Sequence, residues 1–119
     1  MIESPYKDII NALVKASKKQ AVTWTRTSSR NEYKAALPSG FVTIYWLPEE
    51  EADYAPMDDP DAFFAIFNNN GDEIYRISCC GRGDADFETL TSLYNAARNS
   101  YLQIDKTLSG LLSDLEYLG

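Results

Sequence analysis

The stretch SCCGRGDAD, residues 78–86, holds the residue types most able to do chemistry. Cys79 and Cys80 could serve as nucleophiles or as a redox pair, but a reactive thiolate needs a base or a nearby cation. The chain contains no histidine, which excludes Ser-His-Asp and Cys-His mechanisms within it. Because neighbouring residues of a strand face opposite ways, we interpret Cys79 as a small core residue and Cys80 as a partly exposed one.

The same stretch contains an RGD tripeptide, Arg82–Asp84, and leads into the alternating acids Asp84, Asp86 and Glu88. Adhesion through RGD requires an extracellular protein, and no export signal is recognisable. The alternating acids could bind calcium or magnesium, but the glycine and glutamate that complete an EF-hand loop do not fall in place. We therefore predict no metal and no cofactor. The stretch is interpreted as a strand end, a glycine turn and a helix cap from Asp84 or Asp86.

The net charge of the chain maps to one short segment. The chain has 18 acidic and 11 basic residues and a net charge of −7. Seven of the acids lie within residues 49–61 without a base among them, so the remainder of the chain is balanced. A chain this acidic has no general attraction to nucleic acid, and we predict no direct nucleic-acid binding. The seven acids are Glu49, Glu50, Glu51, Asp53, Asp58, Asp59 and Asp61.

This acidic segment also carries residues suited to protein contacts. Tyr54 and Met57 lie within it and Trp46 lies just before it. Clustered acids attract a basic surface and speed encounter, and aromatic residues and methionine are frequent at interfaces. We interpret Trp46 and the acidic segment as the binding site for a basic protein, such as an enzyme or complex that itself binds nucleic acid. A solubilising connector and a divalent-cation site are the alternatives.

The periodicity of the chain predicts a single α+β domain over residues 1–119. Ser4-Pro5 is expected to cap and begin a helix that runs to Lys19, with apolar residues on one face. Strand signals and turn residues then alternate, and Asn70-Gly71 is a strong hairpin signal. We expect an antiparallel meander of five strands in sequential order. These strands are Val22–Thr27, Glu32–Leu37, Phe41–Leu47, Ala62–Phe67 and Asp72–Cys80.

The third and fourth of these strands have no polar face. Strands of this kind are usually covered on both sides. We therefore expect helices on each side of the sheet, or a partner chain.

Apolar residues recur at spacings of three and four from Phe87 to Leu118. One straight helix of this length would measure about 50 Å, whereas a compact domain of this size is roughly 35 Å across. The helix must therefore bend, break or project beyond the sheet. Gly110 is its weakest point and Asn99-Ser100 the second. The first half is expected to pack on the sheet. Homodimer contacts are expected at Leu108, Leu111, Leu115 and Leu118.

The second half of the chain resembles small bacterial and phage-associated proteins that share a strand, a Gly-Asp/Glu hairpin and a leucine-ended helix. The resemblance lies in AFFAIFNNNGDEIYRI and in the motif L-x-x-L-Y-x-x-A-R, formed here by Leu90, Leu93, Tyr94, Ala97 and Arg98. No activity is attached to that group, so the resemblance implies no catalytic residues. It favours a role in biological conflict, as in immunity proteins, toxin neutralisers and anti-defence proteins.

These observations lead to three functional hypotheses. The first is a non-enzymatic inhibitor or immunity-type protein, bacterial or phage-encoded, that binds a basic partner. The second is a homo-oligomeric structural or regulatory protein that uses its C-terminal helix, and the third is a small enzyme that depends on a divalent cation. The first residues do not resemble a signal peptide and no run of 18 apolar residues occurs, so a cytoplasmic protein without membrane contact is expected.

Overall fold

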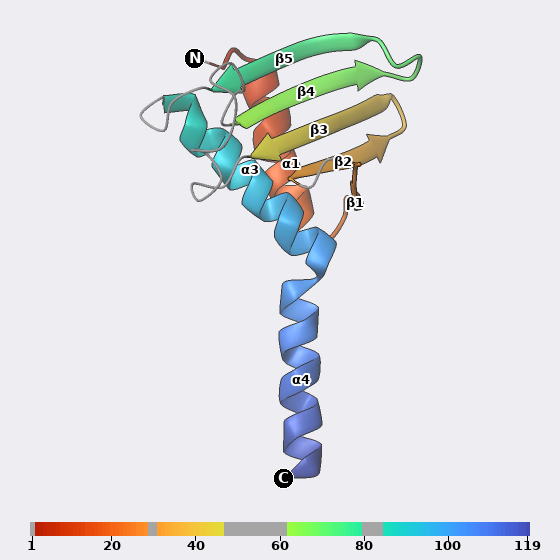
Figure 1. Cartoon of the computed structure of the whole chain (residues 1–119), viewed down its shortest axis with the longest axis vertical. Helices are drawn as coiled ribbons and strands as arrows, with labels where there is room; N and C mark the ends of the chain where they lie inside the picture. The colour runs from red at the N-terminus through yellow and green to blue at the C-terminus, as the bar shows by residue number, and fades with distance from the viewer. Residues whose placement is uncertain (1, 29–30, 47–61, 80–84) are drawn as a thin grey trace.

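The computed structural model describes residues 2–28, 31–46, 62–79 and 85–119. Helix α1 comes first, five strands follow, and α3 and α4 end the chain, which confirms the predicted α+β fold (Figure 1). The helices are α1 (Tyr6–Lys18), α3 (Ala85–Leu102) and α4 (Ile104–Leu118). The strands are β1 (Trp24–Arg26), β2 (Glu32–Leu37), β3 (Gly40–Trp46), β4 (Ala62–Asn68) and β5 (Glu73–Cys79).

The strands form one antiparallel sheet in the order β1-β2-β3-β4-β5, so the predicted meander is confirmed. Its register places Ile44 of β3 opposite both Tyr33 of β2 and Phe64 of β4. The Asn-Gly signal marks the β4–β5 hairpin, where Gly71 adopts a φ of 86°. That left-handed conformation is one that glycine adopts without a steric cost.

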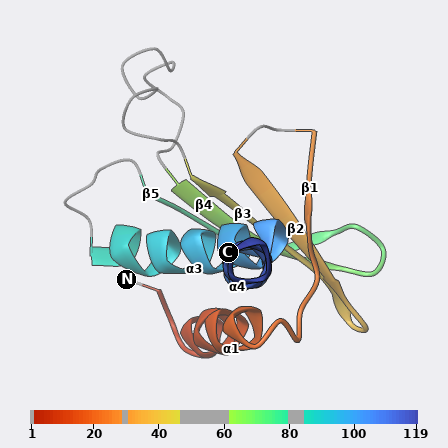
Figure 2. The same ribbon diagram turned by 90° about the horizontal axis from the view of Figure 1, so that it is seen from below.

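Both helices that pack on the sheet lie on the same side of it (Figure 2). Helix α3 crosses the strands directly and α1 packs against α3, so the core fills one face of the sheet. Among the described residues, no helix covers the other face. In the described part of the chain, α1 and α3 therefore lie on one side of the sheet only, and what covers the other side stays a prediction.

The apolar stripe of α3 meets the sheet as predicted, and Phe87, Leu90, Tyr94 and Ala97 are buried. Leu93 is fully buried as well, although its position in the repeat lies beside the stripe. The reason is that α3 is sandwiched between the sheet and α1. A helix in that position needs a wider apolar surface than one that packs on a single side.

The start and end of α1 differ in how they are fixed. The predicted Ser4 cap is wrong, since the Ser4 hydroxyl donates to the Asp8 carboxylate at 3.2 Å and makes no cap to a backbone amide. Near the other end, the Trp24 indole N–H donates to the buried Ser17 hydroxyl at 2.7 Å, and that hydroxyl donates to the Leu13 carbonyl. This chain of hydrogen bonds ties α1 to the first strand.

The predicted C-terminal helix is broken into α3 and α4, and α4 projects from the body. The break is not at Gly110, the position expected from helix propensity. The break is at Gln103, whose φ of 52° and ψ of 47° are left-handed, while Gly110 lies inside α4. The Tyr101 ring lies 5.2 Å from the Tyr33 ring, and the Arg26 guanidinium lies 5.4 Å from Tyr101. These contacts hold the end of α3 at the sheet edge. The helix therefore breaks where its packing surface ends, and α4 extends away from the body (Figure 1).

Candidate functional site

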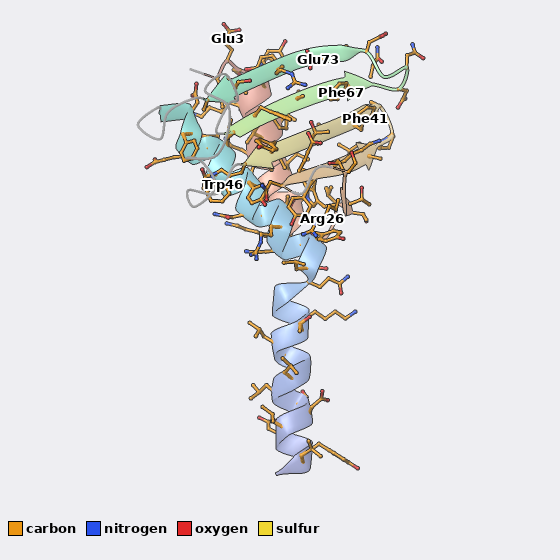
Figure 3. All side chains as sticks on the ribbon, viewed as in Figure 1. Glu3, Arg26, Phe41, Trp46, Phe67 and Glu73 are labelled. Carbon is orange, nitrogen blue, oxygen red and sulfur yellow. The ribbon has the colours of Figure 1, made fainter. Side chains whose placement is uncertain are left out.

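The helix-free face of β3 and β4 carries two stacked pairs of aromatic rings. Phe41 lies against Phe67 with ring centroids 4.6 Å apart, side by side on neighbouring strands (Figure 3). Tyr45 lies against Phe63 at 5.0 Å. We call the surface formed by these four rings, together with Lys34 and Arg76, the outer face. All four rings are half-buried, although no described helix covers them. Cross-strand aromatic pairs stabilise a sheet, and half-exposed ones also offer rigid contact area to a partner.

A cation lies over one ring of each stack. The Lys34 ammonium is 4.2 Å from the centroid of Phe41, and the Arg76 guanidinium is 4.5 Å from that of Phe63. Arg76 is further held by Glu73 through an ion pair of 2.6 Å. Exposed contacts of this kind each contribute about 0.5–1 kcal/mol. Each contact therefore favours this arrangement of the side chains over others by a small factor.

The outer face has an approximate twofold pattern around the paired residues Thr43 and Ala65. Both are small and buried between the two aromatic stacks. In the register, Lys34 pairs with Thr43 just as Arg76 pairs with Ala65, so the two cations occupy equivalent positions. The surface therefore consists of two similar halves with a narrow strip of small residues between them.

The acidic segment connects the same two strands that carry the outer face. Trp46, the last residue of β3, pairs with Ala62, the first residue of β4, so the connection leaves and re-enters the sheet at neighbouring positions. Nine of the predicted partner-binding residues lie outside the described residues, and their role stays a prediction. These are Glu49, Glu50, Glu51, Asp53, Tyr54, Met57, Asp58, Asp59 and Asp61.

Trp46 lies on the helix-facing side of the sheet, opposite the outer face. Its ring centroid is 5.4 Å from that of Tyr94 on α3, and the side chain is half-buried against the core. Its backbone N–H donates to the Asn31 carbonyl at 3.2 Å. Most of its packing is therefore with its own domain.

Of residues 78–86, the structure describes the end of β5 and the first turn of α3. Cys79 is buried, as predicted, whereas Cys80 and Asp84 lie outside the described residues. Asp86 lies in the first turn of α3 and is buried, and its carboxylate accepts a hydrogen bond of 3.1 Å from the Ile2 amide. This acid therefore fixes the start of the chain against α3.

A polar groove lies between α1 and α3. Its walls include Ser17, Lys18, Asn95 and Asn99. The residues that line it include no cysteine and no carboxylate, so they offer no acid–base pair. Within the described ranges, no group of three cysteine or acidic side chains is placed to hold a metal ion. No helix in the described part of the chain is long and apolar enough to cross a lipid bilayer.

Tyr94, which contacts both Trp46 and Tyr33, makes the stability of this region depend on pH. Burial raises the pKa of its hydroxyl above the ordinary value of 10.0, and Tyr33 adds to the effect. The folded state thus favours the neutral phenol. This contribution to stability is complete below pH 10 and is lost as the pH rises through the folded-state pKa.

We therefore expect Tyr94→Phe to make the alkaline loss of stability shallower. The measurement is the free energy of unfolding by denaturant from about pH 8 to pH 11. An equally steep fall in the variant and in the unchanged protein would contradict this assignment.

The four leucines predicted to mediate oligomerisation all lie on α4. Leu108, Leu111, Leu115 and Leu118 are exposed, and Leu112 beside them is exposed as well. The structure thus places them together on a helix that leaves the body, with no described element packed against them (Figure 3).

The outer face is the candidate surface that sequence reasoning missed. The sequence did carry a signal for this surface, because β3 and β4 have apolar residues on both faces. That pattern does not indicate which of the two faces α1 and α3 cover. No protein-family model, curated protein or solved structure matches this chain.

Proposed function

We propose that this chain is a non-enzymatic protein-binding protein, of the inhibitor, immunity or anti-defence type, that engages a basic surface of another protein. The observation that carries the proposal is that the outer face and the acidic segment belong to the same pair of strands. Strands β3 and β4 display the stacked aromatic rings of the outer face, and the connection between them, residues 47–61, holds seven acids. A partner can meet both at once because both belong to one pair of strands.

The outer face has the properties of an interface centre. Its aromatic rings stack on one another and under Lys34 and Arg76, so little side-chain freedom remains to be lost on binding. Half-buried aromatic clusters on a face that no described helix covers are suited to protein contacts. The acidic segment would supply attraction at longer range and select a basic partner.

The test of this proposal compares two triple variants with the same net charge. One carries Asp58→Asn, Asp59→Asn and Asp61→Asn in the acidic segment. The other carries Asp72→Asn, Asp114→Asn and Glu116→Gln, three exposed acids elsewhere. The partner is captured from a bacterial lysate, identified by mass spectrometry and purified, and its affinity for each protein is measured by calorimetry.

We expect the acidic-segment variant to bind about tenfold more weakly, because three rim charges of about 0.5 kcal/mol each are removed. The control variant should bind as the unchanged protein does. Equal affinities of the two variants would contradict a role for the acidic segment, since they differ only in where the charge is lost.

A second candidate function, a homo-oligomeric structural or regulatory protein, is favoured by the exposed leucines of α4. Five leucines on one helix that no described element covers are costly to leave in water. The mass of the full chain in solution, measured by light scattering, tests this candidate. A monomer at every concentration would remove it.

A further inference from the structure

Helix α4 presents a continuous apolar surface to solvent. We call it the leucine surface, and it consists of Leu108, Leu111, Leu112, Leu115 and Leu118, whose side chains are 53–79% exposed. Its spacing of three and four places all five on one side of the helix. The contacts of Tyr101 with Tyr33 and Arg26 fix where the preceding helix ends, so the leucine surface starts from a fixed point on the body.

The charges of α4 argue against a membrane as the occupant of this surface. Helices that lie on lipid bilayers carry many lysines or arginines on the polar side. Here Lys106 is the one base of α4, against the acids Asp105, Asp114 and Glu116. A net negative helix is repelled by anionic lipid headgroups, whereas another protein helix with a leucine surface would match it directly.

We propose that the leucine surface pairs with the same surface of a second copy of the chain, with the two α4 helices antiparallel. This inference rests on the second candidate function and adds the partner surface and its orientation. In such a pair each copy presents the same patch to the other, which closes the assembly at two chains.

The antiparallel register follows from the positions of the leucines. When Leu108 of the first copy is aligned with Leu111 of the second, Leu118 of the first copy lies at the level of Tyr101 of the second. Tyr101 and Leu102, at the junction of α3 and α4, are 38% and 40% exposed. Fifteen residues of helix span about 22 Å, so the second α4 ends at this junction and meets apolar surface there.

Electrostatics favours the antiparallel over the parallel arrangement. The acids Asp114 and Glu116 lie in the last turns of α4, whereas Asp105 and Lys106 cancel in the first turn. A parallel pair would bring the two acid-rich ends together. In this register, Asp114 of one copy lies on the same flank as Thr107 of the other, offset from it by about 3 Å along the helix axis. The Thr107 hydroxyl is able to donate to a carboxylate there, and the antiparallel pair also opposes the helix dipoles.

The first arm of the test asks whether the leucine surface holds two copies together. The mass of the full chain is measured by light scattering over a concentration series, with Leu111→Asp as the seam variant and Ser113→Asp as the control. Both variants add one acid to α4. The unchanged chain and Ser113→Asp should form dimers, and Leu111→Asp should weaken the dimer by about a hundredfold. Circular dichroism checks that both variants are folded.

The second arm tests the orientation by disulfide formation. Thr107→Cys and Asp114→Cys variants are mixed and oxidised, and the unchanged chain is oxidised alongside to account for Cys79 and Cys80. The inference predicts a mixed disulfide between the two variants. Leu115→Cys, which would lie about 16 Å from its counterpart in an antiparallel pair, should not cross-link to itself.

Two results would overturn the proposal, and they differ in what else they remove. A monomer at every concentration would overturn both the antiparallel pair and the second candidate function. A dimer that lacks the mixed disulfide, or in which Leu115→Cys cross-links to itself, would overturn the antiparallel pair alone. Neither result bears on the binding of a basic partner.

Discussion

Phe64→Ala is expected to lower the free energy of unfolding by about 3–5 kcal/mol, the usual cost of a large cavity in a core. Phe64 is fully buried in the middle of β4, where it pairs with Ile44 and Ile77 on the helix-facing side of the sheet. Removal of the ring therefore leaves a cavity inside the core rather than a hollow at the surface. Denaturant unfolding followed by circular dichroism measures the loss.

The matched control is Phe63→Ala, one residue earlier on the same strand. Its side chain lies on the outer face, where it is half-buried and stacks on Tyr45, so its removal should cost about 1 kcal/mol. The same variant should weaken partner binding, because a ring of the outer face is lost. Equal losses of stability in the two variants would contradict the assignment of the two faces.

Gly40→Ala is expected to lower the free energy of unfolding by about 1–3 kcal/mol. A Cβ atom at Gly40 would overlap the Phe67 carbonyl oxygen, which belongs to the backbone of the neighbouring strand. Gly40 begins β3 and pairs with Leu37 and Asn68, so any shift there separates strands on both sides. The cost should appear as a lower midpoint of denaturant unfolding.

Gly110→Ala is the control for Gly40→Ala. No atom lies within 4 Å of a Cβ placed there, and alanine is about 1 kcal/mol better than glycine inside a helix. We expect unchanged or slightly higher stability and more helical signal in circular dichroism. A large loss at Gly110, or none at Gly40, would contradict the packing described for these two positions.

The fold was predictable because the local signals agreed with one another. The strands alternate with strong turn residues, and the Asn-Gly pair marks the β4–β5 hairpin where Gly71 has its positive φ. The position of the helix break was not predictable from propensity. A glycine inside a helix costs only about 1 kcal/mol, and loss of a packing surface after Tyr101 outweighs it.

The candidate site was predictable only in part. Charge counting located the acidic segment, since composition needs no structure. The outer face could not be assigned, because the apolar residues of β3 and β4 point both ways. Only the placement of α1 and α3 shows which side of the sheet the described helices leave uncovered (Figure 2). For the same reason Trp46 was named as a contact residue, although its ring lies against Tyr94 on the helix-facing side.

The most direct test of the proposed function is the salt dependence of partner binding. The affinity of the captured partner is measured at increasing sodium chloride for the unchanged chain and for the variant with Asp58→Asn, Asp59→Asn and Asp61→Asn. Salt screens exposed charges, so binding through the acidic segment should weaken steeply with salt in the unchanged chain and less steeply in the variant. Identical slopes for the two proteins would contradict recognition of a basic surface by this segment.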